Sequence, residues 1–301
     1  MTQFKAKRGA TNRVIGMLPF LRGFFFGFYF FSFSYYLLSG RKRRQLRLLR
    51  GEQDSWEPMK ELKENGMAKW KALASPKEVL ALKDIVRSYT LAAEKYFLSQ
   101  PLESRRSYVK EFNCEFTRNN AWHEDDGRYR ALFTEKFGFP DFIHNFIAEK
   151  KLYDFATHYF GTWCYLTACL LERYEYAANV QHDWHVDTIG DELKVMVLLA
   201  DTPIESGPLR YQKFSHLPDS ILNPFYYLIF KYGQLYQGLI LTQMAARPVY
   251  GTGSAGDAIV FDTAGMHSTT QIISGERYCL VFKFRAKSAK NLFVRFLGAG
   301  F

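Results

Sequence analysis

Two histidines and one aspartate in this chain have the residue types and spacing of a metal-ligand set. His185 and Asp187 are two positions apart, and His267 follows 82 positions after His185. Two histidines and one carboxylate hold iron(II) on one face and leave the opposite face open for chemistry. If the segment of His185 is a strand, side chains two positions apart point to the same face and can bind one ion together. The sequence therefore predicts a metal site, and the alternative is a buried, hydrogen-bonded cluster without iron.

Arg277 follows His267 by ten positions, at the start of a strand-like run over residues 277–284. His267 itself follows a second strand-like run, 257–262, and a turn signal lies at 274–276. This order predicts a hairpin that returns Arg277 to the metal. A fixed guanidinium there suits bidentate pairing with the far carboxylate of a dicarboxylate co-substrate. A surface salt bridge is the alternative for Arg277.

Four segments around these residues carry a more specific signal. They read QHDWHVD (181–187), KVMVLLAD (194–201), ESGPLRY (205–211) with Ser215-His216, and GDAIVFDTAGMH (256–267). Together they resemble the phytanoyl-CoA dioxygenase family, over roughly residues 150–285 and not over the first hundred residues. Members of this family are iron(II)- and 2-oxoglutarate-dependent oxygenases built on a double-stranded β-helix.

The resemblance implies a fold and a set of roles. The expected fold is mainly β with flanking helices, a double-stranded β-helix of the jelly-roll or cupin-like kind. The implied metal ligands are His185, Asp187 and His267, and Arg277 is the implied anchor for 2-oxoglutarate. Thr269 stands where this family often has a hydroxyl group that assists the same carboxylate. The implied cofactors are iron(II), 2-oxoglutarate as co-substrate, and dioxygen.

Three features of the chain bear on how far the family pattern applies. Lys213-Phe214-Ser215-His216 stands where Pro-Gly-Ser-His is common, which changes a supporting turn. A long apolar insert, 217–250, is expected to shape substrate access or to form a helical lid on the barrel. Asp187 is retained, whereas related halogenating enzymes replace this carboxylate with a small residue. The expected reaction is therefore hydroxylation or a related oxidation.

The positive charge of the chain is confined to its N-terminal arm. Residues 1–50 contain eleven Lys or Arg and no Asp or Glu, while residues 51–301 contain 29 basic and 30 acidic residues. The predicted catalytic part therefore has no surplus positive charge for binding nucleic-acid phosphates. The four cysteines form no Cys-x-x-Cys pair, and we interpret them as buried, reduced residues of a cytosolic protein.

An aromatic segment in the arm predicts contact with a membrane. Residues 23–40 contain no charged side chain and are followed at once by Arg41-Lys42-Arg43-Arg44. As a spanning helix the segment is at the short end of the usual range, and the charge asymmetry would place the catalytic domain on the cytoplasmic side. As a monotopic anchor it would lie among the headgroups while the basic run binds anionic lipid. A buried aromatic helix of a soluble protein is the third interpretation.

The chain is therefore expected to contain three regions: a basic arm over 1–50 with the anchor at 23–40, a helical buttress over 51–110, and a β-helix domain over 111–301 with the insert at 217–250. Helical periodicity predicts helices over 57–70, 76–97 and 141–159, the last ending at Gly161. Strand-like sequence runs from about Trp163 to Phe284.

The hypothesis from the sequence is a dioxygenase, attached to the membrane through residues 18–50, that hydroxylates an organic substrate. The membrane arm and the apolar insert favour a lipid or lipid-linked molecule, and a soluble small metabolite is the alternative substrate. Two interpretations outside catalysis remain open at this stage. One is a metal-binding β-helix module without activity, and the other is a membrane scaffold recruited through its basic arm.

Overall fold

A computed structural model of the chain describes residues 56–100, 106–118, 128–174, 184, 185, 187, 192–216 and 248–286. The predicted membrane anchor 23–40 and the basic arm around it lie outside these residues, as does the insert except for its last residues, 248–250. Among the described residues, no helix is both long enough and apolar enough to cross a membrane.

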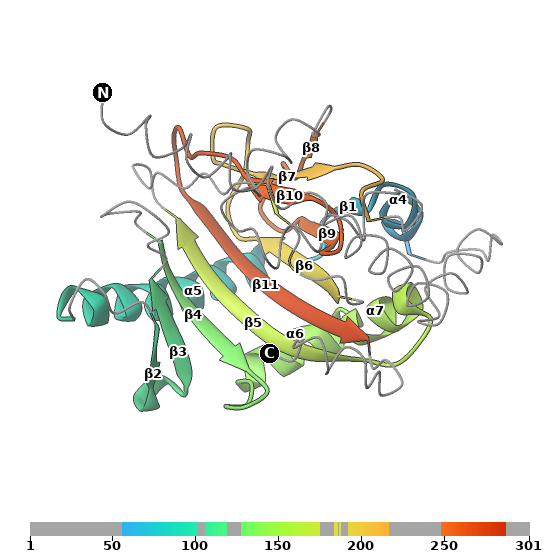
Figure 1. The fold of residues 1–301 in the computed structure, drawn as a ribbon. Helices are drawn as coiled ribbons and strands as arrows, with labels where there is room; N and C mark the ends of the chain where they lie inside the picture. The colour runs from blue at the N-terminus through green and yellow to red at the C-terminus, as the bar shows by residue number, and fades with distance from the viewer. Residues whose placement is uncertain are drawn as a thin grey trace, which may run out of the picture.

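Two antiparallel β-sheets form the centre of the described structure (Figure 1). The larger sheet has the strand order β1-β9-β6-β11-β5-β4-β3-β2, and the smaller has the order β10-β7-β8. The strands of the larger sheet are β1 (Met67–Trp70), β2 (Arg106–Val109), β3 (Cys114–Arg118), β4 (Arg128–Thr134), β5 (Cys164–Tyr174), β6 (Glu192–Leu198), β9 (Ala258–Asp262) and β11 (Arg277–Ala286). Those of the smaller sheet are β7 (Leu209–Gln212), β8 (Pro248–Tyr250) and β10 (His267–Thr269).

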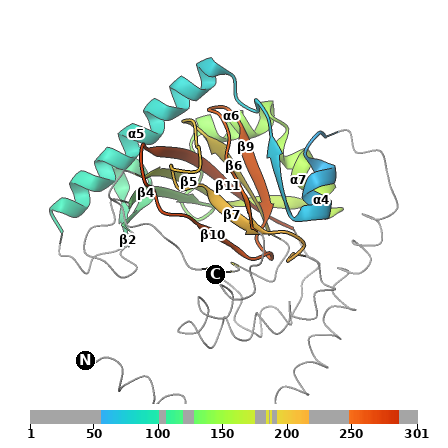
Figure 2. The same ribbon diagram turned by 90° about the horizontal axis from the view of Figure 1, so that it is seen from above.

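Helices cover one face of the larger sheet, and the smaller sheet lies on the other face (Figure 2). The described helices are α4 (Met59–Asn65), α5 (Pro76–Leu98), α6 (Asp141–Glu149) and α7 (Leu152–Phe160), with a short 3-10 turn at Lys110–Phe112. Helix α5 packs on β4, β5 and β11, and α7 packs on β5 and β11. The prediction of a mainly β, jelly-roll fold with flanking helices is confirmed.

Successive apolar side chains of the central strands point to opposite faces of the larger sheet and so form two separate apolar cores. On β6, Leu193, Val195 and Val197 face the helices, whereas Met196 and Leu198 face the smaller sheet. Strands β9 and β11 alternate in the same way, because successive side chains of a strand point to opposite faces. The core under the helices is the larger of the two. The face of the larger sheet that points to the smaller sheet, called the inner face below, therefore contributes less apolar burial to stability and can hold polar residues.

Helix α5 begins and ends where its sequence predicts. Ser75 caps its N-terminus by accepting a hydrogen bond from the backbone of Glu78, whose side chain accepts one in return from the backbone N–H of Ser75. This reciprocal pair satisfies two N–H groups that would otherwise lack a partner. The buried side chains recur every three or four positions, which places them on one face: Val79, Leu82, Val86, Thr90, Ala93 and Phe97.

The predicted bounds of the two other helices are wrong, because in each range a residue with a left-handed backbone conformation interrupts the helix. The helix expected over 57–70 ends at Gly66, which adopts a left-handed conformation (φ 82°), and the chain continues as β1. Strand β1 is an edge strand of the larger sheet and pairs with β9, and that pairing outweighs helical periodicity. The helix expected over 141–159 is broken at Lys151, also left-handed (φ 52°), into α6 and α7. Its predicted end at Gly161 is confirmed.

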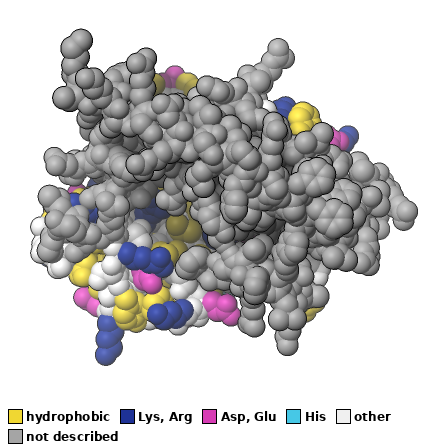
Figure 3. All heavy atoms as spheres, viewed as in Figure 1, with side chains coloured by type: hydrophobic (Ala, Val, Ile, Leu, Met, Phe, Trp, Pro, Cys, Tyr) yellow, Lys and Arg dark blue, Asp and Glu magenta, His cyan; other side chains and the backbone are white. Residues whose placement is uncertain are grey.

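The described surface that remains in view in Figure 3 mixes basic, acidic and apolar side chains. This mixture agrees with the near balance of 29 basic and 30 acidic residues after residue 50. A basic face for nucleic acid needs an excess of one sign.

The cap of α5 generates a prediction about stability. The Lys150 Nζ atom lies 2.6 Å from Glu78 Oε1. Partial burial alone would raise the pKa of Glu78, but hydrogen bonds from Lys150 and Ser75 lower it to about 2. Because the folded pKa is below the usual value of 4.5, ionised Glu78 stabilises the fold above about pH 4.5, and this stabilisation is lost as the pH falls towards 2. Glu78→Gln should lower the free energy of unfolding at pH 7 by about 1–2 kcal/mol.

The measurement is urea unfolding of both proteins between pH 7 and pH 2. The difference between them should shrink steadily below about pH 4.5, whereas Glu111→Gln, at an exposed acid, should change little at any pH. A constant difference down to pH 2 would mean that the charge of Glu78 contributes nothing.

Candidate functional site

Backbone pairing holds together His185 and His267, the first and the last of the three predicted metal ligands. His185 forms an isolated antiparallel bridge with His267, the first residue of β10. The N–H of each histidine donates to the carbonyl of the other, and both N···O distances are 2.9 Å. Two residues on, the N–H of Asp187 donates to the carbonyl of Thr263 at 3.2 Å. The segment of His185 and Asp187 therefore lies beside β10 as an added strand-like edge.

His185, Asp187 and His267 form one compact cluster, as the sequence predicted. One donor atom from each residue can be chosen so that all three lie within 4.8 Å of one another. The Asp187 carboxylate lies between the histidines, with Oδ1 3.7 Å from His185 Nε2 and Oδ2 3.6 Å from His267 Nε2. Donors that bind one ion at about 2.1 Å are separated by about 3 Å or somewhat more. Small side-chain movements would therefore bring all three onto a single ion.

The ring of His267 is oriented by its own backbone neighbourhood. Its Nδ1 atom lies 2.9 Å from the carbonyl oxygen of Gly265, so Nδ1 carries the proton and donates. The Nε2 atom then holds a lone pair, and it is buried without a hydrogen-bond partner among the described residues. Phe261 packs against the ring at 5.1 Å between centroids. A buried lone pair aimed at a carboxylate and fixed by a second-sphere hydrogen bond fits a metal ligand.

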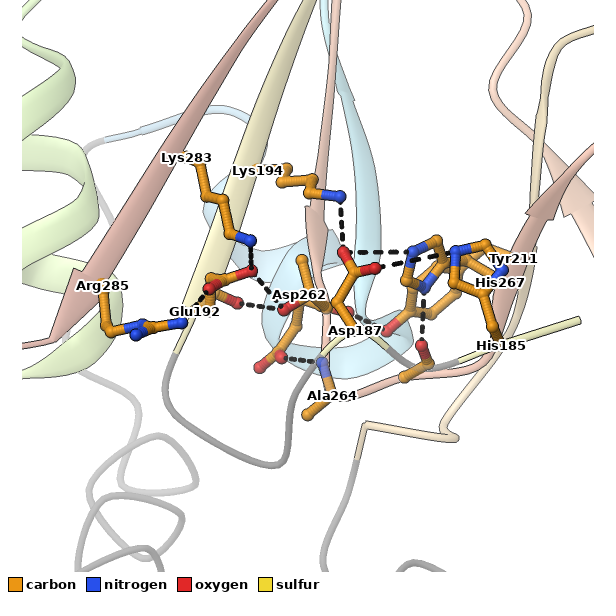
Figure 4. A network of polar contacts seen from close by, with 12 residues as sticks. His185, Asp187, Glu192, Lys194, Tyr211, Asp262, Ala264, His267, Lys283 and Arg285 are labelled. Atoms are coloured by element: carbon orange, nitrogen blue, oxygen red, sulfur yellow. Dashed lines mark hydrogen bonds and ion pairs between the residues drawn. The ribbon is translucent and has the colours of Figure 1, made fainter. Parts of the chain in front are cut away.

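Lys194 is an unpredicted member of the site. From β6 it forms an ion pair and hydrogen bond with Asp187 Oδ2 (Figure 4). Burial alone would raise the pKa of Asp187, but the positive charge of Lys194 holds this pKa well below its usual range. The carboxylate is therefore ionised and ready to bind a cation. A metal ion and Lys194 would share this one carboxylate group.

Arg277 begins β11, as predicted, but not through a hairpin with β10. Strand β10 pairs with β7 in the smaller sheet, whereas β11 pairs with β5 and β6 in the larger one. The chain crosses from one sheet to the other between them, and Ile272 forms a bridge with Ser206 on the way. The hairpin prediction was wrong because a turn signal between two strands does not reveal that they belong to different sheets.

The guanidinium of Arg277 is fully buried, with the residue 1% exposed. Its Nη1 donates to the carbonyl of Gly207, and its Cζ lies 4.2 Å from the ring centroid of Tyr174. Its Nε–H has no hydrogen-bond partner among the described residues, and the same is true of the buried Thr269 hydroxyl. Thr269 is two positions after His267 on β10, so both side chains point to the same face. An unpaired buried donor is costly, and a carboxylate ligand would satisfy both groups.

A charged cluster at the ends of β6 and β11 was also missed. Glu192 is completely buried and accepts from Lys283 at 3.1 Å and from Arg285 at 2.8 Å. Figure 4 shows this cluster in one row with Lys194 and Asp187. The signal was present in the sequence, because Glu192 and Lys194, like Lys283 and Arg285, are charged residues two apart in otherwise apolar strands. Only the antiparallel register shows that the two pairs meet.

Comparisons with known proteins show which family and which structures the chain is similar to. A sequence model described as phytanoyl-CoA dioxygenase (PhyH) matches residues 62–278, more than two thirds of the chain. No curated protein sequence gives a match. The remaining comparison is with solved structures, at sequence identities that show the fold alone.

Three of these structures illustrate the likeness. AviO1 from Streptomyces viridochromogenes Tue57 is 16% identical with a TM-score of 0.54, over 79% of this chain and 98% of that one. EctD from S. alaskensis with bound Fe is 17% identical with a TM-score of 0.54, over 79% and 80% of the two chains. The epimerase SnoN in complex with Fe3+, alpha ketoglutarate and nogalamycin RO is 14% identical with a TM-score of 0.52, over 80% and 84%. The iron and the ketoacid expected from the sequence are present in these neighbours, Fe in EctD and both Fe3+ and alpha ketoglutarate in SnoN.

The contact of Gly265 with Tyr211 generates a prediction about the site. A Cβ atom at position 265 would lie 1.8 Å from the hydroxyl oxygen of Tyr211. Gly265→Ala must therefore shift Tyr211 or the carbonyl that orients His267, and overpacking of this kind costs about 1–3 kcal/mol. Iron(II) affinity, measured by anaerobic titration, should fall about tenfold or more, since each 1.4 kcal/mol is about tenfold.

Gly138→Ala is the matched control, because no atom lies within 4 Å of its added Cβ although the residue is left-handed (φ +81°). It should lose about 1 kcal/mol of stability and keep its iron affinity. Unchanged iron affinity in Gly265→Ala would contradict the role given to the Gly265 carbonyl.

Proposed function

The chain belongs to the phytanoyl-CoA dioxygenase family, and from that premise we propose that it is an iron(II)- and 2-oxoglutarate-dependent dioxygenase that hydroxylates an organic substrate. One observation carries the proposal. Three residues implied by the sequence, His267, Thr269 and Arg277, each hold a buried polar atom that has no partner among the described residues. A metal ion and a dicarboxylate would satisfy all three.

The metal would be held by His185, Asp187 and His267. Two imidazoles and one carboxylate are the ligand set typical of iron(II) oxygenases and leave coordination positions open. Bound there together with 2-oxoglutarate, iron(II) supplies the means of activating dioxygen against an unactivated C–H bond. The chain itself orients the metal ligands, because the His185–His267 bridge and the Gly265 carbonyl fix the positions of their donor atoms.

The far carboxylate of 2-oxoglutarate would be bound by Arg277 with help from Thr269. The Tyr174 ring packs against the guanidinium and fixes its plane, and the Gly207 carbonyl occupies one of its donors. The remaining donors and the Thr269 hydroxyl are then available to the ligand. Tyr174 belongs to the apolar inner core together with Met196 and Val281, and apolar surroundings of this kind exclude water.

Hydroxylation is the reaction that the retained Asp187 favours, since this carboxylate would hold the metal where related halogenating enzymes leave room for a halide. A metal-binding module without activity is the alternative, and Arg277 argues against it. A structural metal site has no need of a buried guanidinium with an unpaired Nε–H. The same argument disfavours a scaffold that functions only through its N-terminal arm.

The substrate that we propose is a lipid or a lipid-linked molecule, with the chain attached to a membrane through residues 18–50 and its catalytic domain facing the cytoplasm. The support is in the sequence: an uncharged aromatic stretch over 23–40 precedes a basic run at 41–44. A soluble small metabolite is the second candidate, because a membrane anchor can serve only to localise an enzyme.

The first prediction from this function concerns co-substrate binding. Anaerobic titration of the iron(II)-loaded protein with 2-oxoglutarate should produce the weak visible charge-transfer band of a ketoacid chelated to iron. Arg277→Lys should raise the 2-oxoglutarate concentration at half-formation about tenfold to a hundredfold, because charge-assisted hydrogen bonds contribute about 1.5–3 kcal/mol. Asp187→Ala and His267→Ala should abolish the band, since each removes a ligand.

The control is Arg106→Lys, at an exposed arginine of β2, which should leave the titration unchanged. Absence of the band from wild-type protein that has bound iron would reject the dioxygenase and favour the binding module. An unchanged midpoint in Arg277→Lys would reject Arg277 as the anchor.

The second prediction concerns the membrane arm. The full-length chain should sediment with vesicles that contain phosphatidylserine and bind weakly to neutral phosphatidylcholine vesicles. Replacing Arg41, Lys42, Arg43 and Arg44 with Gln should weaken binding to the anionic vesicles by several hundredfold, on the order of 1 kcal/mol for each basic residue. Equal binding of wild type and variant to both vesicles would reject an electrostatic anchor, and no binding at all would reject membrane attachment.

A further inference from the structure

The ends of strands β6 and β11 carry a group of charges that neither metal binding nor 2-oxoglutarate binding uses. Strand β6 contributes Glu192 and Lys194, and β11 contributes Lys283 and Arg285. In the antiparallel register, Lys194 is opposite Lys283 and Glu192 is opposite Arg285. All four lie on one side of the larger sheet, because the residue between the first two, Leu193, belongs to the core under the helices.

This group is next to the metal site. Lys194 pairs with Asp187, and the Thr263 hydroxyl donates to Glu192 at 3.3 Å while the Thr263 carbonyl accepts from the Asp187 backbone. Figure 4 shows Arg285, Glu192, Lys283, Lys194 and the Asp187 cluster as one continuous row of polar side chains. Lys194 and Thr263 therefore connect this group directly to the metal site.

The charges of the group do not balance. Lys283 and Arg285 share a single carboxylate, Glu192, which leaves one positive charge in excess. Two lysines directly opposite each other on neighbouring strands repel and weaken a sheet. The excess grows when a metal ion takes Asp187, because Lys194 then shares its carboxylate partner with the ion. A bound anion would remove both the excess charge and the repulsion.

The two outer cations are also available to a ligand. The side chain of Lys283 is 27% exposed and that of Arg285 is 28% exposed, although Glu192 between them is completely buried. The Nε–H of Arg285 is buried and has no hydrogen-bond partner among the described residues. An arginine whose Nη2 is taken by one carboxylate still has donors in its planar fork for a second oxyanion.

We propose that Lys283 and Arg285 form a specificity site that binds an oxyanion group of the substrate, a carboxylate or a phosphate, and so directs the rest of the substrate towards the metal. Glu192 pairs with both cations and competes with the oxyanion for them. This inference rests on the proposed function and names a property of the substrate, its negative charge, that the function alone does not specify.

The test uses methyl phosphate and acetate as separate probes of the two oxyanions. Each is titrated calorimetrically into full-length protein loaded with iron(II) and saturated with 2-oxoglutarate under anaerobic conditions. Saturation occupies Arg277 and all but one of the coordination positions of the metal, and the variants below separate binding at Lys283 and Arg285 from binding at the position that is left. Wild-type protein should bind one of the probes in the millimolar range, and the tighter of the two identifies the oxyanion.

Three variants separate a binding role from a structural one, because they act in opposite directions. Lys283→Gln and Arg285→Gln should each weaken binding of the probe about tenfold or more, since each removes a charge-assisted hydrogen bond. Glu192→Gln should tighten binding about tenfold, because it removes the carboxylate that competes with the probe for the same two cations. The control Lys77→Gln, at an exposed lysine on the helix-covered side, should have no effect.

The outcomes that overturn the proposal are specific. The first is failure of wild-type protein to bind either probe, and the second is unchanged affinity in Lys283→Gln and Arg285→Gln. The third is weaker binding in Glu192→Gln, which is the result that a purely structural network would give. If Arg285→Gln does not fold, Lys283→Gln decides the result, because Glu192 then keeps Arg285 as its partner. The ketoacid band recorded in the same samples keeps the two proposals separate. Oxyanion binding with the predicted pattern but without the band would support the specificity site and reject the dioxygenase.

Discussion

The candidate metal site depends on one backbone interaction, the reciprocal hydrogen bonds between His185 and His267. They join two segments 82 positions apart and set the distance between the two imidazoles. Asp187 follows on the same edge, tied by its N–H to Thr263. Because the constraint is made by main-chain atoms, it does not depend on which metal is present, and the ligands are placed before any ion arrives. Such pre-organisation lowers the entropic cost of collecting three side chains around an ion.

A second consequence follows from the layer of helices. Helices α5 and α7 cover the outer face of the larger sheet and bury most of the apolar core there. The inner face is consequently able to hold ionised groups that do little for stability. A buried ion pair is often no better for stability than apolar residues of similar volume. The clusters around Asp187 and Glu192 are therefore better explained by what they bind than by the fold that they occupy.

Much of this site could be predicted from the sequence, because the decisive signals are local. The spacing of His185 and Asp187 and the strand-like runs before His267 and after Arg277 each involve a few neighbouring residues, and the structure has them as expected. Resemblance to a known family then indicated the fold. The helix expected over 57–70 failed at Gly66, where pairing of β1 with β9 outweighs a local helical pattern.

What the sequence missed at the site has one physical origin, which is the register between distant strands. Nothing in the local sequence of Lys283 says that it faces Lys194, 89 positions earlier in the chain. The hairpin expected between β10 and β11 failed for the same reason, since the two strands lie in different sheets. The exact register decides which charged side chains meet, because a slip of one position turns every side chain of a strand to the other face.

The ion pair between Lys194 and Asp187 combines these constraints at a single carboxylate. In the absence of a metal, Lys194 offsets the cost of keeping an ionised carboxylate on the inner face, and it keeps the pKa of Asp187 low. A divalent ion carries twice the charge of a lysine and approaches an oxygen more closely, so Coulomb attraction favours the ion over Lys194. With an ion bound, Lys194 would share its carboxylate and, opposite Lys283, would add to a local excess of positive charge. On the proposal that Lys283 and Arg285 bind an oxyanion, occupation of the metal site would then strengthen the attraction for a negatively charged substrate.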